Sequence, residues 1–217
     1  VGPLARRLWK QMASDGWAGI GWPKEYGGQG RTPIEQFVFF DESMRSGAPV
    51  PMLTINSVAP TIMQYGSEEQ KAFYLPKILA GDIHFAIGYT EPEAGTDLAS
   101  LKTRAVRDGD EYVIDGTKTW VTNGERAGLI ALAARTEEGI TCFMVEKEPG
   151  PSSGGITVSR NIGKLGYKGL ETVEMSYAGH RVPADWVLGG EAGLGFFRQL
   201  VQTNGLSVRQ GHSLLNN

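Results

Sequence analysis

The spacing of the apolar residues changes at about residue 82, and this change constrains the fold more than any other feature of the sequence. Before it, apolar residues recur every three or four positions, as on one face of an α-helix. After it, short β-rich runs alternate with turn residues, which is typical of an antiparallel sandwich or barrel. Helical spacing returns after residue 195. The sequence therefore predicts an α+β fold: an N-terminal all-helical domain at 1–81, a middle β-barrel or β-sandwich domain at 82–190, and the start of a C-terminal helical domain at 191–217.

Local signals mark where two of the expected helices begin. Thr32 precedes a proline and is followed three residues later by Glu35, which is the pattern of a capping box. Ser67 and Gln70 form a second capping box. Pro76 lies inside the helix that Ser67 begins, so we expect a kink or an early end there. Helical spacing also covers 4–13 and 57–64.

Turn residues divide the middle domain into eight expected strands. These strands are expected at 84–89, 101–106, 111–114, 118–122, 129–134, 141–145, 157–159 and 172–177. Asp108-Gly109 and Asp115-Gly116 are interpreted as the turns of two hairpins. Gly116-Thr117-Lys118-Thr119 is similar to the end of a phosphate loop, but Glu111 stands where that motif needs glycine, so we interpret this segment as a hairpin.

Composition excludes several classes of function. The 21 basic and 24 acidic residues nearly balance, which argues against a nucleic-acid-binding or polybasic membrane surface. No apolar run approaches the ~20 residues that span a bilayer. The single cysteine, Cys142, excludes an internal disulfide and is expected to be a packed strand residue. The histidines lack metal-ligand spacing, so no metal is predicted; they are His84, His180 and His212.

Two segments combine turn residues, hydroxyls and a large aromatic ring. Trp120 and Thr122 lie two residues apart, so their side chains point to one face of an extended strand. Thr90 and Thr96 flank a turn that can present hydroxyls and backbone N–H groups to a ligand. The pattern alone equally allows a packed strand aromatic and turn hydroxyls that satisfy local backbone groups.

The acidic residues of the first segment are interpreted as a solvated turn rather than a catalytic group. They are Glu91, Glu93 and Asp97. Asp97 is expected to cap backbone N–H groups.

Six segments resemble, in order, the acyl-CoA dehydrogenase family. They are Gly19-Ile20-x-Trp22-Pro23-x-Glu25-Tyr26-Gly27-Gly28-x-Gly30, Tyr65-Gly66-Ser67-Glu68-Glu69-Gln70-Lys71, Thr90-Glu91-x-x-Ala94-Gly95-Thr96-Asp97, Asp115-Gly116-x-Lys118-x-Trp120-Val121-Thr122-Asn123-Gly124, Lys164-Leu165-Gly166 and Arg181-Val182-Pro183-Ala184-Asp185. The resemblance covers nearly the whole chain up to about Gln202.

This resemblance implies FAD-dependent α,β-dehydrogenation of an acyl-CoA thioester, in which a carboxylate base removes the α-proton and the β-hydride passes to flavin N5. Trp120 would flank the flavin ring, and Thr122 would hydrogen-bond near N5. Thr90 would meet the pyrimidine edge, and Thr96 would lie near both the flavin diphosphate and the substrate. The implied cofactor-binding residues are Ile87, Gly88, Tyr89, Thr90, Gly95, Thr96, Trp120, Val121 and Thr122.

The resemblance also implies partners and a cell compartment. An electron-transfer flavoprotein is the expected electron acceptor, and a homo- or hetero-oligomer is the expected assembly. The expected location is the cytoplasm of a bacterium or the mitochondrial matrix of a eukaryote.

Departures from the family pattern leave two alternatives open. Many relatives have a small aliphatic residue where Tyr89 stands, and often serine in place of Thr96. The C-terminal helical domain that carries the catalytic base in relatives is largely absent, so no residue of this chain is assigned as the base. The alternatives are a non-catalytic subunit or degenerate homologue that supports a partner carrying the base, and an acyl-CoA oxidase.

Overall fold

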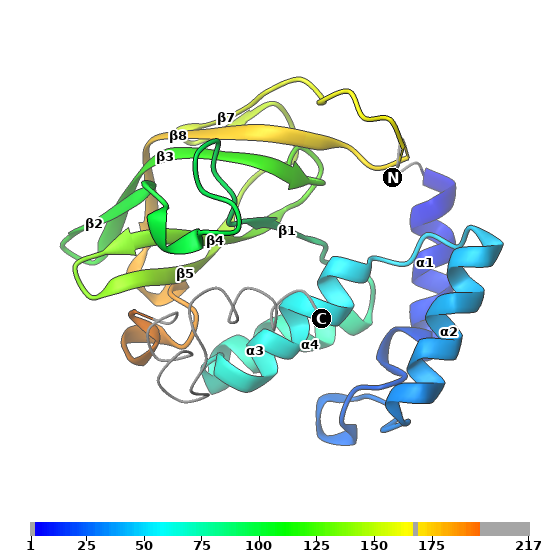
Figure 1. The fold of residues 1–217 in the computed structure, drawn as a ribbon. Coiled ribbons are helices and arrows are strands. Elements are labelled where there is room, and N and C mark those ends of the chain that lie inside the picture. Colours follow the sequence, from blue (N-terminus) through cyan, green and yellow to red (C-terminus); the bar gives the residue numbers. More distant parts are fainter. Residues whose placement is uncertain (1–2, 167–168, 196–217) are drawn as a thin grey trace.

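Helices form the first part of the molecule and a curled β-sheet forms the second (Figure 1). The structure is a computed structural model that describes residues 3–166 and 169–195. The α-helices are α1 (Pro3–Ser14), α2 (Pro33–Ser46), α3 (Ala59–Tyr65), which follows a π-helical turn at Thr54–Val58, and α4 (Glu68–Leu79). The strands are β1 (Phe85–Gly88), β2 (Arg104–Asp108), β3 (Glu111–Thr122), β4 (Leu129–Thr136), β5 (Gly139–Glu146), β6 (Ser152–Ser153), β7 (Ile156–Val158) and β8 (Thr172–Pro183). The predicted order of a helical region and then a β region is confirmed.

Both predicted capping boxes are present. The Thr32 hydroxyl accepts a hydrogen bond from the N–H of Glu35, and the Glu35 carboxylate accepts one from the N–H of Thr32. Ser67 and Gln70 make the same pair of bonds at the start of α4. Of the two alternatives predicted at Pro76, a kink or an early end, the early end is wrong, because α4 continues to Leu79. Proline removes only one helical hydrogen bond, and burial of Ile78 holds the last turn against the core.

The sheet has the strand order β1-β4-β2-β3-β8-β7-β6, with β5 also paired to β4. Most pairs are antiparallel, as predicted, but β1 runs parallel to β4, and β2 meets β4 in a parallel bridge. The connection from β1 passes through a long loop and β2–β3 before the chain returns as β4. Sequence spacing within single strands does not reveal such a non-local parallel pairing.

The hairpin predicted at Asp115-Gly116 is wrong, because β3 is one continuous strand. Its register against β8 shifts between Ile114 and Gly116, which makes a bulge rather than a turn. Gly116 has φ 151°, and a Cβ there would lie 2.7 Å from Cα of Thr103. Glycine is therefore needed for the close approach of Thr103. The hairpin predicted at Asp108-Gly109 is confirmed between β2 and β3.

Two hydrophobic cores lie on opposite faces of β4. Leu129 and Ala131 pack in the core shared with the helices, whereas Ile130 and Leu132 pack in the core enclosed by the sheet. Figure 1 shows α3 and α4 on the helical side of β4 and β5. Because both faces of β4 are covered, its sequence is a nearly continuous apolar run rather than an alternation of apolar and polar residues.

Only residues 191–195 of the predicted C-terminal helical segment are described. They include part of a short 3₁₀ turn, Gly190–Gly193. The rest of the segment, and with it His212, lies outside the described residues.

Candidate functional site

A bulge in β3 turns Trp120 toward solvent. The register of β3 against β8 shifts between Lys118 and Val121, and Trp120 has a left-handed φ of 58°. Its side chain is 59% exposed, whereas Val121 beside it is fully buried. Thr122 is half-buried, so burial alternates from Trp120 onward as the two-residue spacing predicted. The alternative of a packed core aromatic is wrong for Trp120. A non-glycine residue in this conformation costs about 1–2 kcal/mol, and such strain often marks a functional position.

The loop at 90–103 lies beside this bulge. The N–H of Thr119 donates a hydrogen bond to the carbonyl of Thr90 at 2.9 Å. Two main-chain hydrogen bonds between Glu91 and Ala94 close a tight turn. Thr96 is exposed after this turn, and a Cβ added to Gly95 would meet only Thr90 Cγ2, at 4.0 Å. The two motifs therefore meet at one surface that combines an exposed indole with hydroxyls and open space over a glycine.

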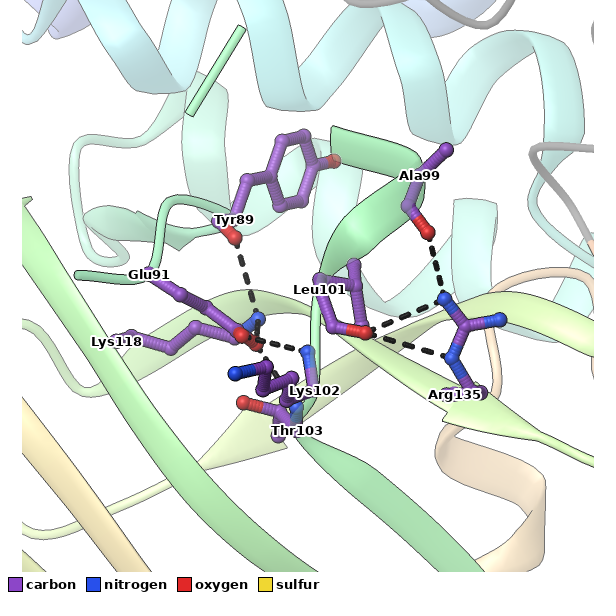
Figure 2. Close-up of polar contacts among 8 residues, drawn as sticks. All are labelled: Tyr89, Glu91, Ala99, Leu101, Lys102, Thr103, Lys118 and Arg135. Carbon is purple, nitrogen blue, oxygen red and sulfur yellow. Dashed lines mark hydrogen bonds and ion pairs between the residues drawn. The ribbon is translucent and has the colours of Figure 1, made fainter. Parts of the chain in front are cut away.

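Beneath the loop lies a buried ion pair (Figure 2). Nζ of Lys118 is 2.7 Å from Oε1 of Glu91, and the side chains are 0% and 6% exposed, respectively. Lys118 also donates to the carbonyl of Tyr89 at 3.1 Å. The Glu91 carboxylate accepts from the N–H groups of Lys102 at 2.6 Å and Thr103 at 2.9 Å. Every one of these bonds joins the two ends of the loop or joins the loop to β3.

The pKa values of this pair are shifted by burial and by the pairing itself. Burial lowers the pKa of Lys118 to about 8, against the opposing effect of the Glu91 carboxylate. Burial alone would raise the pKa of Glu91, but the hydrogen bonds from Lys118, Thr103 and Lys102 outweigh it and lower that pKa below its ordinary value. The prediction that Glu91 is a solvated turn residue is wrong.

Arg135 of β4 fastens the far end of the same loop (Figure 2). Its Nη2 donates to the carbonyl of Ala99 at 2.6 Å and to the carbonyl of Leu101 at 3.2 Å. No role for the side chain of Arg135 or Lys118 is predicted from the sequence. The available signal was a charged residue within a β-rich run, which must find a partner if that run is buried.

The other two acidic residues of the loop are exposed, as predicted. Glu93 pairs with Lys102 at the surface. The predicted capping of backbone N–H groups by Asp97 is wrong, because its carboxylate instead accepts from the Ser100 hydroxyl at 2.5 Å.

Tyr89 packs into the helical core. Its hydroxyl lies 3.8 Å from Sγ of Cys142, and both side chains are buried. Both also line a cavity of about 10 Å³ between α3 and the sheet, together with Ser57 and Thr61. Burial raises the pKa of the Cys142 thiol to about 12, so the prediction that Cys142 is a packed residue is confirmed.

The predicted cofactor-binding residues thus divide into two groups. Trp120, Thr122, Thr90, Gly95 and Thr96 have exposed or half-exposed positions at the surface described above. The side chains of Tyr89 and Val121 are in the cores, Ile87 packs against the helical core, and Gly88 is buried.

Within residues 3–166 and 169–195, no group of three or more His, Cys, Asp or Glu residues has the geometry of a metal site. His84 is half-buried, and His180 is buried with its Nδ1 2.5 Å from the carbonyl of Gly154. No helix among the described residues is long and apolar enough to cross a membrane.

Comparison with known proteins shows the family of the chain. Residues 2–82 match the model of the acyl-CoA dehydrogenase N-terminal domain, and residues 86–179 match that of the acyl-CoA dehydrogenase middle domain. The chain belongs to the acyl-CoA dehydrogenase family. Its members are oxidoreductases, and the family cofactor is FAD.

Three relatives illustrate the similarity. Acyl-CoA dehydrogenase FadE26 of Mycobacterium tuberculosis is 60% identical over 136 residues, which are 63% of this chain and 34% of that protein. The ChsE4-ChsE5 complex of the same organism superposes with a TM-score of 0.82 at 46% identity, over 94% of this chain and 52% of the matched chain. A structure described as the Tcur3481-Tcur3483 steroid ACAD has a TM-score of 0.80 at 45% identity, over 99% of this chain and 54% of the matched chain. The chain therefore spans about half the length of most relatives that it matches, and a third of the FadE26 sequence.

Proposed function

We propose that the protein is an FAD-dependent acyl-CoA dehydrogenase, and that this chain supplies the flavin-facing surface of its active site. The observation that carries the proposal is the placement of Trp120. Trp120 is 59% exposed, because its own left-handed backbone conformation in the β3 bulge turns the side chain toward solvent. Exposure of so large an apolar side chain is unfavourable in water. A flat aromatic cofactor stacked on the indole would cover that apolar area.

The neighbouring residues suit the edge of such a ring. Thr90, Thr96 and Thr122 offer hydroxyls, which both donate and accept hydrogen bonds. Gly95 leaves room above the loop, because a side chain there would project into open space next to Thr90. When bound, FAD would accept a hydride from the β-carbon of the substrate. The chain itself would hold the ring and keep water from one of its faces.

The proton-accepting base is proposed to come from outside the described residues. Glu91, the buried carboxylate of the first motif, is fully engaged with Lys118 and two backbone N–H groups, so it is not free to take a proton. Glu171, which follows the 159–170 segment, accepts from the N–H of Arg126 and pairs with its guanidinium. Both carboxylates therefore have structural partners.

The similar structures support the proposed substrate and assembly. One is described as a steroid ACAD, and two carry paired chain names. We therefore propose a bulky acyl-CoA thioester as the substrate and a hetero-oligomer as the assembly, with an electron-transfer flavoprotein as the electron acceptor. The location proposed is the cytoplasm, or the mitochondrial matrix if the source is eukaryotic.

A visible spectrum of the intact purified protein, recorded before and after anaerobic addition of an acyl-CoA mixture that includes steroid thioesters, tests the proposal. Flavin bands that bleach on addition are expected. Flavin bands that persist with every thioester would instead favour the non-catalytic subunit. Absence of flavin from protein that has been incubated with FAD would contradict the proposed surface.

The oxidase alternative differs in the fate of the reduced flavin. An oxidase consumes oxygen during turnover, whereas a dehydrogenase passes its electrons to a protein acceptor. We expect turnover to require an added electron-transfer flavoprotein or an artificial acceptor, with negligible oxygen uptake in its absence.

A further inference from the structure

We propose that Glu91 and Lys118 are positioning residues, which fix the 90–103 loop against the Trp120 bulge and so set the shape of the flavin-facing surface. The inference rests on the proposed function for its ligand, but it also makes a prediction that needs no ligand. Neither side chain reaches the surface, so neither would touch the cofactor. Both would act through the loop that they hold.

Glu91 closes the loop on itself. Its two carboxylate oxygens accept from the N–H groups of Lys102 and Thr103, eleven and twelve residues further along the chain. A single side chain thus joins the first residues of the loop to the last. The residues between them include Gly95 and Thr96, whose positions depend on this closure because the sheet pairs with neither.

Lys118 attaches the closed loop to β3. Its ammonium donates both to Glu91 and to the carbonyl of Tyr89, the residue at which β1 passes into the loop (Figure 2). Trp120 follows two residues later in β3, and Thr119 between them donates its N–H to Thr90. Displacement of the Lys118 side chain would therefore move the loop relative to the indole.

Burial makes the arrangement sensitive to the loss of either charge. A buried charge without a partner is strongly destabilising, whereas removal of both charges together is often tolerated. Removal of both charges can therefore test whether the pair positions the loop, apart from the stability that is lost when a single charge is left unpaired. The Glu91→Leu/Lys118→Met double variant removes both charges and should regain much of the stability that either single variant loses. It cannot restore the hydrogen bonds to Lys102 and Thr103, because leucine has no acceptor.

The test compares Glu91→Gln, Lys118→Met and the Glu91→Leu/Lys118→Met double variant with Glu93→Gln in the intact protein. Glu93 lies two residues from Glu91 on the same loop but is exposed, so its conversion to an amide is a matched control. Amide hydrogen exchange of the FAD-free protein reports the closure of the loop. We expect exchange at 102 and 103 to be roughly 10- to 100-fold faster in the double variant and unchanged in Glu93→Gln.

Titration with FAD then measures the consequence for the surface. We expect the double variant to bind FAD roughly tenfold or more weakly and to quench flavin fluorescence less, although its unfolding midpoint is higher than that of Lys118→Met, which leaves the Glu91 charge buried without its partner. Wild-type exchange and wild-type FAD affinity in the double variant would overturn the inference. If the wild-type protein itself bound no FAD while the exchange result held, the proposed function would fail but the closure of the loop would stand.

Discussion

The N–H of Thr119 donates to the carbonyl of Thr90 at 2.9 Å, and this hydrogen bond joins the two motifs that define the candidate site, as the Lys118–Glu91 ion pair also does. It places the start of the 90–103 loop directly beside the residue that precedes Trp120. Trp120 therefore lies in the chain directly after a residue bonded to the loop, although the loop and Trp120 are far apart in the sequence.

Replacement of Trp120 by alanine should separate binding from stability. Because its side chain is largely exposed, we expect Trp120→Ala to change the free energy of unfolding by less than about 1 kcal/mol. We expect FAD affinity to fall about tenfold, because stacking on the indole is lost. Trp17→Ala is the control, since Trp17 is also exposed but stacks on Phe39 in the helical region. Equal FAD affinities of the two variants would contradict the proposed surface.

The buried ion pair should give the stability a measurable dependence on pH. Burial lowers the pKa of Lys118 from 10.5 to about 8 in the folded state, so between these values the unfolded chain binds more protons. Stability therefore rises with pH across this window. Relative to Glu91→Leu/Lys118→Met, the free energy of unfolding of the wild type should increase by up to about 3 kcal/mol from pH 8 to 10.5.

The same pair should also make stability rise with pH in the acid range. Hydrogen bonds lower the pKa of Glu91 below the ordinary 4.5 despite its burial, so the stability it contributes is present above that value. This contribution is lost as pH falls through the folded-state pKa. Denaturant titrations across the two pH ranges measure both effects. Parallel pH profiles of the wild type and the double variant would show that the pair does not titrate as described.

Local signals allowed the helical region to be predicted closely. The capping boxes at Thr32 and Ser67 involve residues three positions apart, and these bonds form whatever the rest of the chain does. Gly116 misled the prediction because Asp-Gly is a common turn signal, whereas here the requirement for glycine comes from Thr103 on another segment. A contact between residues of two different segments, such as that of Gly116 with Thr103, produces no periodic pattern in the sequence.

The candidate site, too, could be predicted only in part from the sequence. The resemblance named Trp120 and the threonines, but it did not reveal that Glu91 and Lys118 are buried partners. Their pairing depends on the bulge in β3 and on the path of the 90–103 loop, which are tertiary features. Many relatives have a small aliphatic residue where Tyr89 stands, and the structure places the Tyr89 ring beside Cys142 in the helical core.

Gly116 should be intolerant of any side chain. A Cβ at this position would lie 2.4 Å from Oγ1 and 2.7 Å from Cα of Thr103, and φ is 151°. We expect Gly116→Ala to reduce the free energy of unfolding by about 2–4 kcal/mol, through overpacking and backbone strain. Gly109→Ala is the control, because Gly109 also has positive φ but has no atom within 4 Å of an added Cβ. That variant should lose only about 1 kcal/mol. Equal losses of unfolding free energy in the two variants, measured by chemical denaturation, would mean that Thr103 moves aside to make room for the added Cβ.

Gln70 should prove to be a main connection between the helical and β regions. From the first turn of α4, its amide donates to the carbonyls of Asp185 and Val187 at 3.1 and 2.8 Å, and its oxygen accepts from the N–H of Gly189 at 2.9 Å. Gln70→Ala removes all three bonds, together with the capping-box bond from the N–H of Ser67, and leaves buried backbone groups without partners. We expect a loss of about 2–4 kcal/mol in the free energy of unfolding.

Two further variants make the Gln70 prediction specific. Gln70→Glu keeps the shape but turns a carboxylate toward two carbonyl oxygens, so it should be at least as destabilising as Gln70→Ala near neutral pH. Gln11→Ala removes an exposed helical glutamine that bonds only Asp15 within its own helical face, and it should change stability by less than about 0.5 kcal/mol. Thermal and denaturant unfolding of the three variants measure these differences. A stable Gln70→Glu protein would show that the amide donors are dispensable, and that packing of α4 alone holds the chain after β8 in place.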